Sequence, residues 1–588
     1  MNAPVEQLWI GDSEPSRKFP LYTRGNAGEV FPNVVSPLTG SLFAQPSVRA
    51  QTAMFKDMGV ILRRDLEDGL AALSGTFGGY LYLNLSIGRL FGARAVGMTP
   101  ADVDQQMFGT SDAPPYRRQP GDRSPLASLR IMTSLVRQMR RPRFEVAAAA
   151  QRAADEWLLG LPDVAAASDE ALLQLVETFP GRLEACFTAL LVATAPAGGG
   201  RAIVERLLAR KAGDEAAHLI NRLTGGLGTI DSALLARRLW AIGRTVAADA
   251  ELTAAFDLGF DTVLPRLRGS GSAAAAACVA DIDAFIDEHG HRGPDEYELA
   301  TPNWRMEPAM ALAAIDRLRL APAERSPEVA QTRLAADRAV ALAEATAMVP
   351  APLRGFFRHS LRSATVGAEM RERAKDAFVK ELSGMRLVLH ELVRRARERG
   401  GPTEARDGFL VTAEELPAYL SDPAAFAAVI DERRARRDEL QARVPPFWFE
   451  GRLPDPSTWE LRAPAAAIGG ETLRLQGLGV CQGHAAGPAR VITDANDPGE
   501  LQPGDILIAP FTDPAWTPLF LAAAAVVVDV GAQQSHAAIV ARELGIPAVV
   551  SVTGASRTIA NGSWVTVNGD TGEVLVEPAR SGASADSP

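Results

Sequence analysis

One histidine of the chain stands in a setting that suits phosphate chemistry. His536 lies in the run Ser-His-Ala-Ala-Ile-Val-Ala-Arg-Glu-Leu-Gly-Ile-Pro, residues 535–547. A ring nitrogen of histidine accepts a phosphoryl group when the ring is neutral and accessible and its surroundings tolerate the doubly charged group. His536 is therefore a candidate phosphoryl carrier. The alternative is a histidine that only caps or packs at the start of a helix.

The elements around His536 are predicted to supply a site for an anion. The apolar run Val526–Val530 is typical of a strand and leads into a loop at 531–534. Ser535 is a favourable helix N-cap, and Gly545 predicts where that helix ends. Unpaired backbone N–H groups and the positive end of the helix dipole then face a phosphate on His536, which typically contributes about 0.3–1 kcal/mol at exposed positions.

Two cations elsewhere in the sequence have the right spacing to assist. In the run Arg371-Glu-Arg-Ala-Lys375, the four-residue spacing places Arg371 and Lys375 on one face of a helix. A guanidinium fork and an ammonium point charge on that face could neutralise a transferring phosphoryl group. The alternative is a solvated, charged helix face without a chemical role.

The elements that must position these residues fall into three regions. The first hundred residues mix turn signals with short apolar stretches, as in 31–37 and 77–84, and are interpreted as short strands and loops. Residues 126–398 show helical spacing with interruptions expected near 197–200 and 269–272, and a further helix is predicted at 423–443.

The C-terminal region changes to a β-type pattern. Strands are predicted at 505–509, 524–530, 548–552 and 564–576, with one clear helix between them. The fold class predicted is multidomain: a mostly α-helical substrate-binding domain followed by a C-terminal α/β domain. The boundaries predicted are a substrate domain at 1–450, a flexible linker rich in Pro, Ala and Gly at 451–470, an α/β domain at 471–578 and a tail at 579–588.

Composition excludes several classes of function. The net charge of -10 opposes broad binding to nucleic acid, although a local basic pocket can still hold phosphate. The cysteines Cys186, Cys278 and Cys481 lie far apart, which argues against a disulfide framework and a structural zinc site, so no metal is expected in this chain. No apolar run is long enough to cross a bilayer and the N-terminus has no leader pattern, so a cytoplasmic protein is expected.

Residues 477–576 resemble the mobile phosphohistidine, or swivel, domain of the PEP-utilising enzymes. The matching segments are Gly477–Val480, Gly487–Arg490, Asp505–Pro510, Ser535–Val549 and Asn568–Glu573. The resemblance implies that His536 carries the phosphoryl group. It also implies that Gly531, Gln534 and Ser535 belong to the phosphate loop, in which Ala532 stands where the family usually has a second glycine.

The preceding half is similar to the substrate domain of rifampicin phosphotransferase and its relatives. The similar segments are Phe19–Glu29, Ser36–Thr39 and Gly290–Pro294 with Glu296 and Leu299 after it, together with the Arg371-Glu-x-x-Lys375 element that supplies catalytic cations in that family. Weaker candidates for substrate binding are Tyr22, Arg24, Asn26, Glu29, His291 and Arg292. Arg24 and Glu29 could equally form an ordinary ion pair, and the turn that holds His291 could be purely structural.

The resemblance also implies a division of labour. The family's PEP-using members place a β/α barrel after the swivel domain, whereas here the swivel domain comes last, so PEP is not the expected donor. A separate ATP-grasp subunit is expected to bind ATP and Mg²⁺ and to phosphorylate His536, with no cofactor in this chain. His536 then passes the group to a hydroxyl of a small, apolar organic acceptor in a dikinase-type reaction that converts ATP to AMP and Pi. The alternative is a non-catalytic binding or regulatory protein that keeps the fold.

Overall fold

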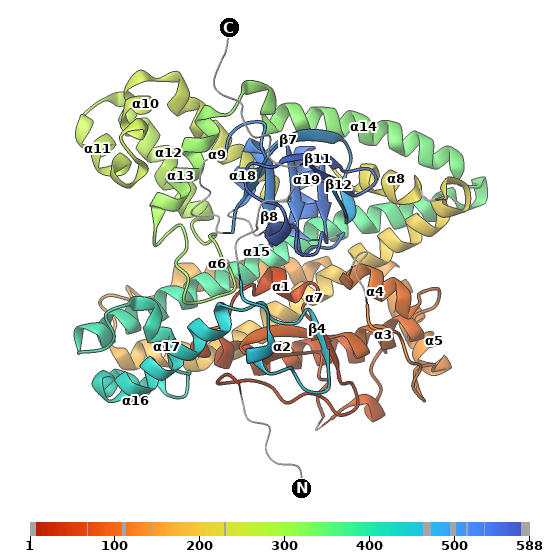
Figure 1. Cartoon of the computed structure of the whole chain (residues 1–588), viewed down its shortest axis with the longest axis horizontal. Coiled ribbons are helices and arrows are strands. Elements are labelled where there is room, and N and C mark those ends of the chain that lie inside the picture. Colours follow the sequence, from red (N-terminus) through yellow and green to blue (C-terminus); the bar gives the residue numbers. More distant parts are fainter. Residues whose placement is uncertain are drawn as a thin grey trace.

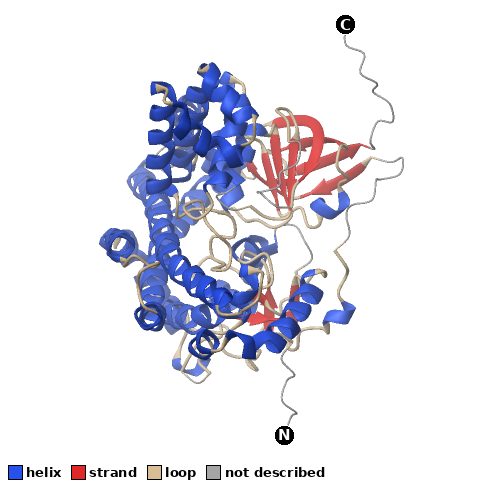
Figure 2. Ribbon diagram, turned by 90° about the vertical axis from the view of Figure 1, so that its left-hand side faces the viewer, coloured by secondary structure: helices blue, strands red, loops and turns tan. Residues whose placement is uncertain are grey.

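The computed structural model describes residues 8–577 except 68, 109–112, 141–142, 214, 228–230, 463–471, 494–500, 513–515 and 534. Figure 1 shows a helical body across which two long helices run, with the C-terminal sheet domain seated between α9 and α14. Seen from the side, helices cover one side of the large sheet while the small N-terminal sheet lies below it (Figure 2). The predicted fold class, a mostly helical region followed by an α/β domain, is confirmed.

Two long helices form the spine of the body. α7 (Asp169–Ala212) and α15 (Arg354–Glu398) pack against each other along their lengths. The interruption predicted near 197–200 is wrong, because α7 continues through it. A Cβ at Gly200 would come within 2.6 Å of the backbone of Ser360 and Ala364 on α15, so glycine serves close helix packing here and does not end the helix. By length and composition α7 could cross a membrane, but it packs between α15 and α2 as a core helix does.

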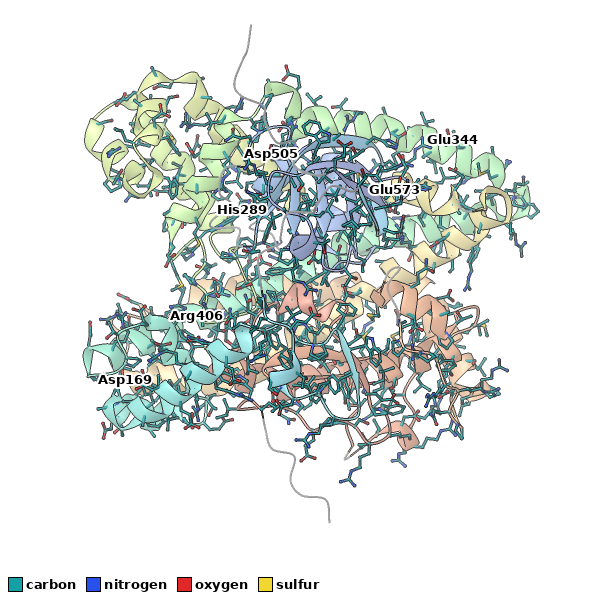
Figure 3. The ribbon with its side chains drawn as sticks, in the orientation of Figure 1. Asp169, His289, Glu344, Arg406, Asp505 and Glu573 are labelled. Carbon is teal, nitrogen blue, oxygen red and sulfur yellow. The ribbon has the colours of Figure 1, made fainter. Side chains whose placement is uncertain are left out.

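The remaining helices of the body surround this pair. They are α1 (Ala27–Val30), α2 (Pro37–Asp57), α3 (Leu85–Arg94), α4 (Pro100–Phe108), α5 (Pro125–Arg140), α6 (Phe144–Gly160), α8 (Glu215–Thr224), α9 (Asp231–Ala248), α10 (Ala250–Asp257), α11 (Val263–Ser270), α12 (Ala273–His289), α13 (Pro308–Leu320), α14 (Pro327–Met348), α16 (Leu416–Ser421) and α17 (Ala427–Gln441). The break predicted near 269–272 is confirmed, as it separates α11 from α12. Figure 3 labels Asp169 at the start of α7 and Glu344 on α14, at opposite sides of the molecule.

A small antiparallel sheet anchors the first hundred residues. Its order is β2-β3-β1-β4, from β2 (Ser74–Phe77), β3 (Tyr80–Asn84), β1 (Leu21–Thr23) and β4 (Trp448–Glu450). The strands predicted at 77–84 are confirmed, and the segment 31–37 is the loop before α2. Tyr22 on β1 pairs with Phe449 on β4, so the end of the body folds back onto its beginning.

The sheet domain has eight strands in the order β5-β12-β11-β7-β8-β9-β10-β6. Strands β7 to β10 run parallel, and the others are antiparallel. The strands are β5 (Leu473–Gln476), β6 (Leu478–Cys481), β7 (His484–Val491), β8 (Ile506–Ala509), β9 (Ala525–Val528), β10 (Ala548–Val550), β11 (Trp564–Asn568) and β12 (Glu573–Glu577), with helices α18 (Thr517–Ala522), α19 (His536–Leu544) and α20 (Ala555–Thr558). The runs predicted at 505–509, 524–530 and 548–552 are β8, β9 and β10, and α19 is the helix predicted among them. The single run predicted at 564–576 forms two strands, β11 and β12, and β5 to β7 and α18 were not predicted.

The turn from β9 into α19 places His536 at a helix N-terminus, as predicted. Ser535 caps the helix because its side chain accepts a hydrogen bond from Ala538 N at 3.3 Å, and Gly545 ends it in the left-handed conformation with φ 65°. Gly531 must be glycine because a Cβ there would lie 2.7 Å from Val550 Cβ. Ala532 has no positive φ, so alanine fits the loop at the position where the family has glycine.

The sheet domain docks on the body through apolar packing and arginine contacts. Residues of α9, α12 and α13 share one hydrophobic core with residues of α18, α19 and β9. Arg325 donates to the carbonyls of Ala522 and Ala523 at 2.6 Å, and Arg333 donates to the carbonyl of Gly545 at 3.2 Å. Cations thus meet the carboxyl ends of α18 and α19, where helix dipoles favour positive charge.

The linker predicted at 451–470 is structured in its first part. Residues 451–462 return along the end of α17, where Val444 N donates to Glu460 O at 2.8 Å and Trp459 is buried. The apolar contact of Trp459 overrides the Pro- and Gly-rich composition that indicated flexibility. The remainder of the predicted linker, like the predicted tail, lies outside the described residues.

Candidate functional site

His536 presents one ring nitrogen to a neighbour and leaves the other without one. Nδ1 lies 3.2 Å from the hydroxyl of Thr512, whereas Nε2 is buried and has no hydrogen-bond partner among the residues that the structure describes. When Nδ1 carries the proton and donates it to Thr512 Oγ1, the lone pair of Nε2 is free to act as a nucleophile. Burial, together with the charges of Lys375 and Arg292, holds the pKa of His536 well below its usual value. The ring is therefore neutral at physiological pH.

His536 opens onto a cavity of about 390 Å³, here called the His536 cavity. Its polar lining includes Thr512, Glu29, Glu296, Arg371 and Lys375, which come from four separate parts of the chain, and further polar residues such as Gln51 and Thr76. Its other walls are largely apolar and include Phe31, Val35, Phe43, Val48, Phe187, Leu190 and Phe378. Such a lining, apolar with a few convergent polar groups, is typical of a small-molecule site.

Arg371 and Lys375 lie together at this cavity, as the spacing predicts. Both line it from α15, and both charges act on the carboxyl of Glu29. The charge of Lys375 also lowers the pKa of His536. Their side chains are mostly buried, with 23% and 16% exposed, so they do not form the solvated helix face that was the alternative.

Glu29 on α1 occupies the anion position of helix α19. Backbone N–H groups of His536 and Ala532 donate to its carboxylate. Burial nevertheless raises the pKa of Glu29 to about 8, although Arg371, Lys375 and these N–H groups act to lower it. The carboxylate therefore fills, in the docked arrangement, the place where helix geometry favours a phosphoryl group.

A buried network holds the base of the site. His291 Nε2 lies 2.8 Å from Asp376 Oδ1, and Arg292 donates to the same oxygen at 3.0 Å. Arg292 also donates to Glu296 Oε1 at 3.0 Å. Burial alone would raise the pKa of Asp376, but the charges of His291 and Arg292 hold it well below its ordinary value. Neither His291 nor Arg292 lines the His536 cavity, so the structure does not place them in contact with a bound acceptor.

Two family models match parts of this chain. Residues 501–572 match the mobile domain of PEP-utilising enzymes, and residues 190–372 match the fourth domain of rifampicin phosphotransferase. The chain carries a PEP-utilising mobile domain. The resemblance inferred from the sequence is confirmed, and His536 is the histidine at the start of α19 in this mobile domain.

Several curated proteins are similar over longer stretches. The prodigiosin synthesizing transferase of Serratia marcescens is 32% identical over 61% of this chain and 40% of its own length. A rifampicin phosphotransferase from a Streptomyces species is 30% identical over 54% of the chain and 36% of its own length. An uncharacterized protein of Mycobacterium tuberculosis is 36% identical over 49% of the chain and 30% of its own length. The chain thus spans two fifths or less of the length of these relatives.

The weaker candidates are placed differently. Tyr22 is buried in the aromatic core, stacked on Phe449 at 5.3 Å between ring centroids, and does not line the His536 cavity. Asn26, like Glu29, does line it. Arg24 does not pair with Glu29: its guanidinium lies over the ring of Tyr80, and its Nη2 donates to the carbonyls of Phe31 and Pro32. Gln534 of the predicted phosphate loop lies outside the described residues.

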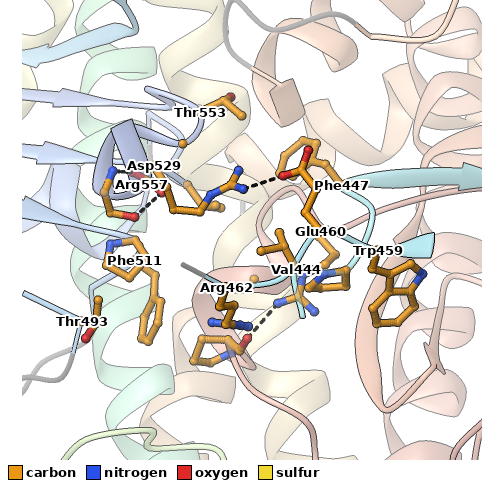
Figure 4. A pocket seen from close by; sticks show the side chains of 18 of the residues that line it. Val444, Phe447, Trp459, Glu460, Arg462, Thr493, Phe511, Asp529, Thr553 and Arg557 are labelled. Carbon is orange, nitrogen blue, oxygen red and sulfur yellow. Dashed lines mark hydrogen bonds and ion pairs between the residues drawn. The ribbon is translucent and has the colours of Figure 1, made fainter. Parts of the chain in front are cut away.

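A second, larger cavity of about 1020 Å³ separates the mobile domain from residues 444–462. Figure 4 shows Phe511, Asp529 and Arg557 of the mobile domain facing Trp459 and Glu460 across it. Arg557 Nη1 lies 2.9 Å from Glu460 Oε2. This ion pair joins the mobile domain to the segment that leads into it, and His536 does not line this cavity.

Glu29 gives the protein a pH dependence of defined sign. Its pKa is raised from 4.5 to about 8 in the folded chain, so the stability it contributes is present below pH 4.5 and is lost as pH rises through 8. We expect Glu29→Gln to gain stability relative to wild type between pH 6.5 and 8.5, by about 1–2 kcal/mol. Thermal unfolding followed by circular dichroism measures this gain in stability. The control is Glu432→Gln, because Glu432 is exposed. If stability changes with pH in the same way in Glu29→Gln and wild type, the raised pKa of Glu29 is contradicted.

Proposed function

We propose that this chain carries a phosphoryl group on Nε2 of His536 and transfers it to a hydroxyl of a small, apolar acceptor bound in the His536 cavity. The observation that carries the proposal is the position of Nε2. It is neutral, has no hydrogen-bond partner and belongs to a residue that lines a largely apolar cavity together with Arg371 and Lys375. A carrier that had just delivered its phosphate would have this arrangement.

Loading of His536 takes place at a second site. In the docked arrangement Nε2 is buried and Glu29 fills the anion position, so the mobile domain must leave the body before a donor can reach the histidine. We propose that a separate ATP-grasp subunit binds ATP and Mg²⁺ there and phosphorylates His536. Water takes the γ-phosphoryl group as Pi, the β-phosphoryl group passes to His536 and AMP is released, in a reaction that we propose takes place in the cytoplasm.

Transfer takes place when the loaded domain returns. The acceptor hydroxyl attacks phosphorus, the P–Nε2 bond breaks, and the ring recovers its electron pair with Nδ1 protonated. Arg371 and Lys375 then face the charge that develops on the phosphoryl oxygens. Protonated Glu29 avoids repelling the incoming group, because its pKa of about 8 keeps it mostly neutral at pH 7. The apolar walls favour an alcohol or phenol over a sugar.

The proposal is tested by following each phosphate of ATP. The chain is incubated with Mg²⁺, the ATP-grasp protein encoded beside its gene, and ATP labelled at either the β or the γ position. We expect acid-labile label on the chain from β-labelled ATP only, with the γ label released as Pi. If neither ATP nor phosphoramidate, a small donor that needs no partner, labels the chain, the carrier proposal is wrong and a non-catalytic binding protein is left.

A further inference from the structure

We propose that Glu296 is the general base that removes the proton from the acceptor hydroxyl. The inference rests on the proposed function, since it names a catalytic residue for that reaction. It rests on the buried position of Glu296, on an oxygen left without a partner, and on the fixed distance to Lys375. No motif identified in the sequence assigns a role to this residue.

Glu296 has one bound and one free carboxylate oxygen. It lines the His536 cavity although only 3% of the residue is exposed. Oε1 accepts a hydrogen bond from Arg292 at 3.0 Å, whereas within the described part of the chain Oε2 has no hydrogen-bond partner. A buried carboxylate oxygen without a donor costs free energy. A substrate hydroxyl that donates to Oε2 would supply the missing hydrogen bond.

The backbone around Glu296 is held in an uncommon conformation. Asp295 has φ 45°, in the left-handed region, and Asn33 donates to its side chain at 3.3 Å. Arg386 donates to the carbonyl of Glu296 at 2.8 Å. Backbone strain of this kind persists only where surrounding contacts enforce it. These contacts hold the backbone of Glu296, and the hydrogen bond from Arg292 to Oε1 holds its side chain.

Lys375 links Glu296 to the carrier histidine. Its Nζ lies 3.8 Å from Glu296 Oε2, and its charge also acts on His536 and Glu29. The ammonium therefore contacts the proposed proton acceptor, and its charge also acts on the phosphoryl donor. In the proposed step it offsets the negative charge of Glu296 and, during transfer, that of the phosphoryl oxygens.

The other carboxylates near the site are less suited to the role. Glu29 receives backbone N–H groups at the phosphate position and is mostly protonated at pH 7. Asp376 does not line the cavity, and its oxygens contact His291, Arg292, Lys380 and Gln151. Glu29 Oε1, like Glu296 Oε2, has no hydrogen-bond partner among the described residues, so the choice of Glu296 rests on the raised pKa of Glu29 and on the contacts that Arg292 and Lys375 make with Glu296.

The proposed step balances in protons and electrons. Glu296 Oε2 takes the hydroxyl proton while the hydroxyl oxygen forms a bond to phosphorus. The P–Nε2 bond breaks, and its electron pair returns to the imidazole, which leaves neutral because Nδ1 holds a proton. The products are a phosphate ester, neutral His536 and protonated Glu296, whose proton passes to solvent when the domain opens.

The test separates loading from transfer. His536 is loaded with phosphoramidate, and the phosphorylated chain is mixed at pH 8 with phenol or with 4-nitrophenol, which is already largely ionised. We expect Glu296→Gln to load like wild type but to transfer to phenol about 10²–10⁴-fold more slowly. Transfer to 4-nitrophenol needs no base and should fall far less. Hydrolysis of the phosphohistidine by cavity water should also slow in the variant.

Controls make each outcome decisive. Glu432→Gln lies on the exposed face of α17 and should behave as wild type in every step. Equal losses with both phenols, or unchanged transfer and hydrolysis in Glu296→Gln, would overturn the role of Glu296. If Glu29→Gln, and not Glu296→Gln, slows transfer to phenol more than transfer to 4-nitrophenol, the base is Glu29. If wild type itself fails to load, the proposed function fails, and that result is distinct because it appears before any acceptor is added.

Discussion

His536→Gln is expected to carry no acid-labile phosphate from either ATP or phosphoramidate. Glutamine keeps a polar side chain at the start of α19 but has no nucleophilic ring nitrogen, so no covalent intermediate can form. Transfer to any acceptor should fall by about 10⁴-fold or more, as when a catalytic nucleophile is removed from other enzymes. Phosphate-affinity electrophoresis at neutral pH, followed by brief acid treatment, measures the bound phosphate.

The matched control is His484→Gln in the same domain. His484 is 63% exposed on β7, and its Nδ1 lies 3.5 Å from Asp570 Oδ2. It should load like wild type. Label that persists in His536→Gln, or that disappears in His484→Gln, would place the carrier on another residue. Thermal unfolding of both variants shows whether the domain remains folded, so loss of label is not mistaken for loss of structure.

The position of His536 could be predicted because local sequence determines it. Ser535 caps the helix through Ala538, three residues on, and Gly545 ends it by adopting a left-handed conformation. These contacts lie within one helix, so they produce a recognisable pattern of residue types at nearby positions in the sequence. The same holds for Arg371 and Lys375, whose common face follows from helical spacing alone. Contacts between residues a few positions apart are the ones that can be predicted from a single sequence.

The partners of these residues could not be predicted in the same way. Thr512 meets His536 from the loop after β8, and Glu296 meets Lys375 across 79 positions of chain, the difference between their residue numbers. Such contacts depend on how helices and sheet pack, and single-sequence patterns do not encode that packing. Glu296 did leave a faint signal, since it follows the Gly290–Pro294 turn that resembled the family, but nothing in the sequence indicated its free oxygen.

Two errors in the fold have one physical cause. The glycines at 198–200 favoured a helix break, yet α7 continues because α15 approaches so closely that a side chain at Gly200 would clash. The composition of 451–462 favoured a flexible linker, yet Trp459 is buried against the body. In both cases tertiary packing outweighs local propensity. Helix α2 was also not predicted, since the first hundred residues were interpreted as short strands and loops. Here the local sequence did carry the signal, because Ser36 is a favourable N-cap and Pro37 a favourable first helical residue.

In the docked arrangement some interactions hold the mobile domain on the helical body and others oppose its docking. Arg325 and Arg333 hold the ends of two helices of the mobile domain, and Arg557 pairs with Glu460 at its entry. Against these contacts stand the desolvation of His536 and the burial of Glu29, both of which shift pKa values away from those in water. The proposed function, in which the domain visits two sites, requires such opposing terms, because a tightly held domain would not reach its donor.

Lys375→Ala is expected to load with phosphate like wild type and to lose transfer by about 10²–10³-fold, the usual effect of removing one group that stabilises transition-state charge. Loading is spared because it takes place with the mobile domain away from α15, where Lys375 lies. Transfer is lost because the phosphoryl oxygens and Glu296 then lack the ammonium between them. Single-turnover transfer from the loaded chain to phenol measures it, with the exposed Lys211→Ala as control. Equal loss in both steps would place Lys375 in folding or docking and not in transfer, and wild-type transfer would remove it from the site altogether.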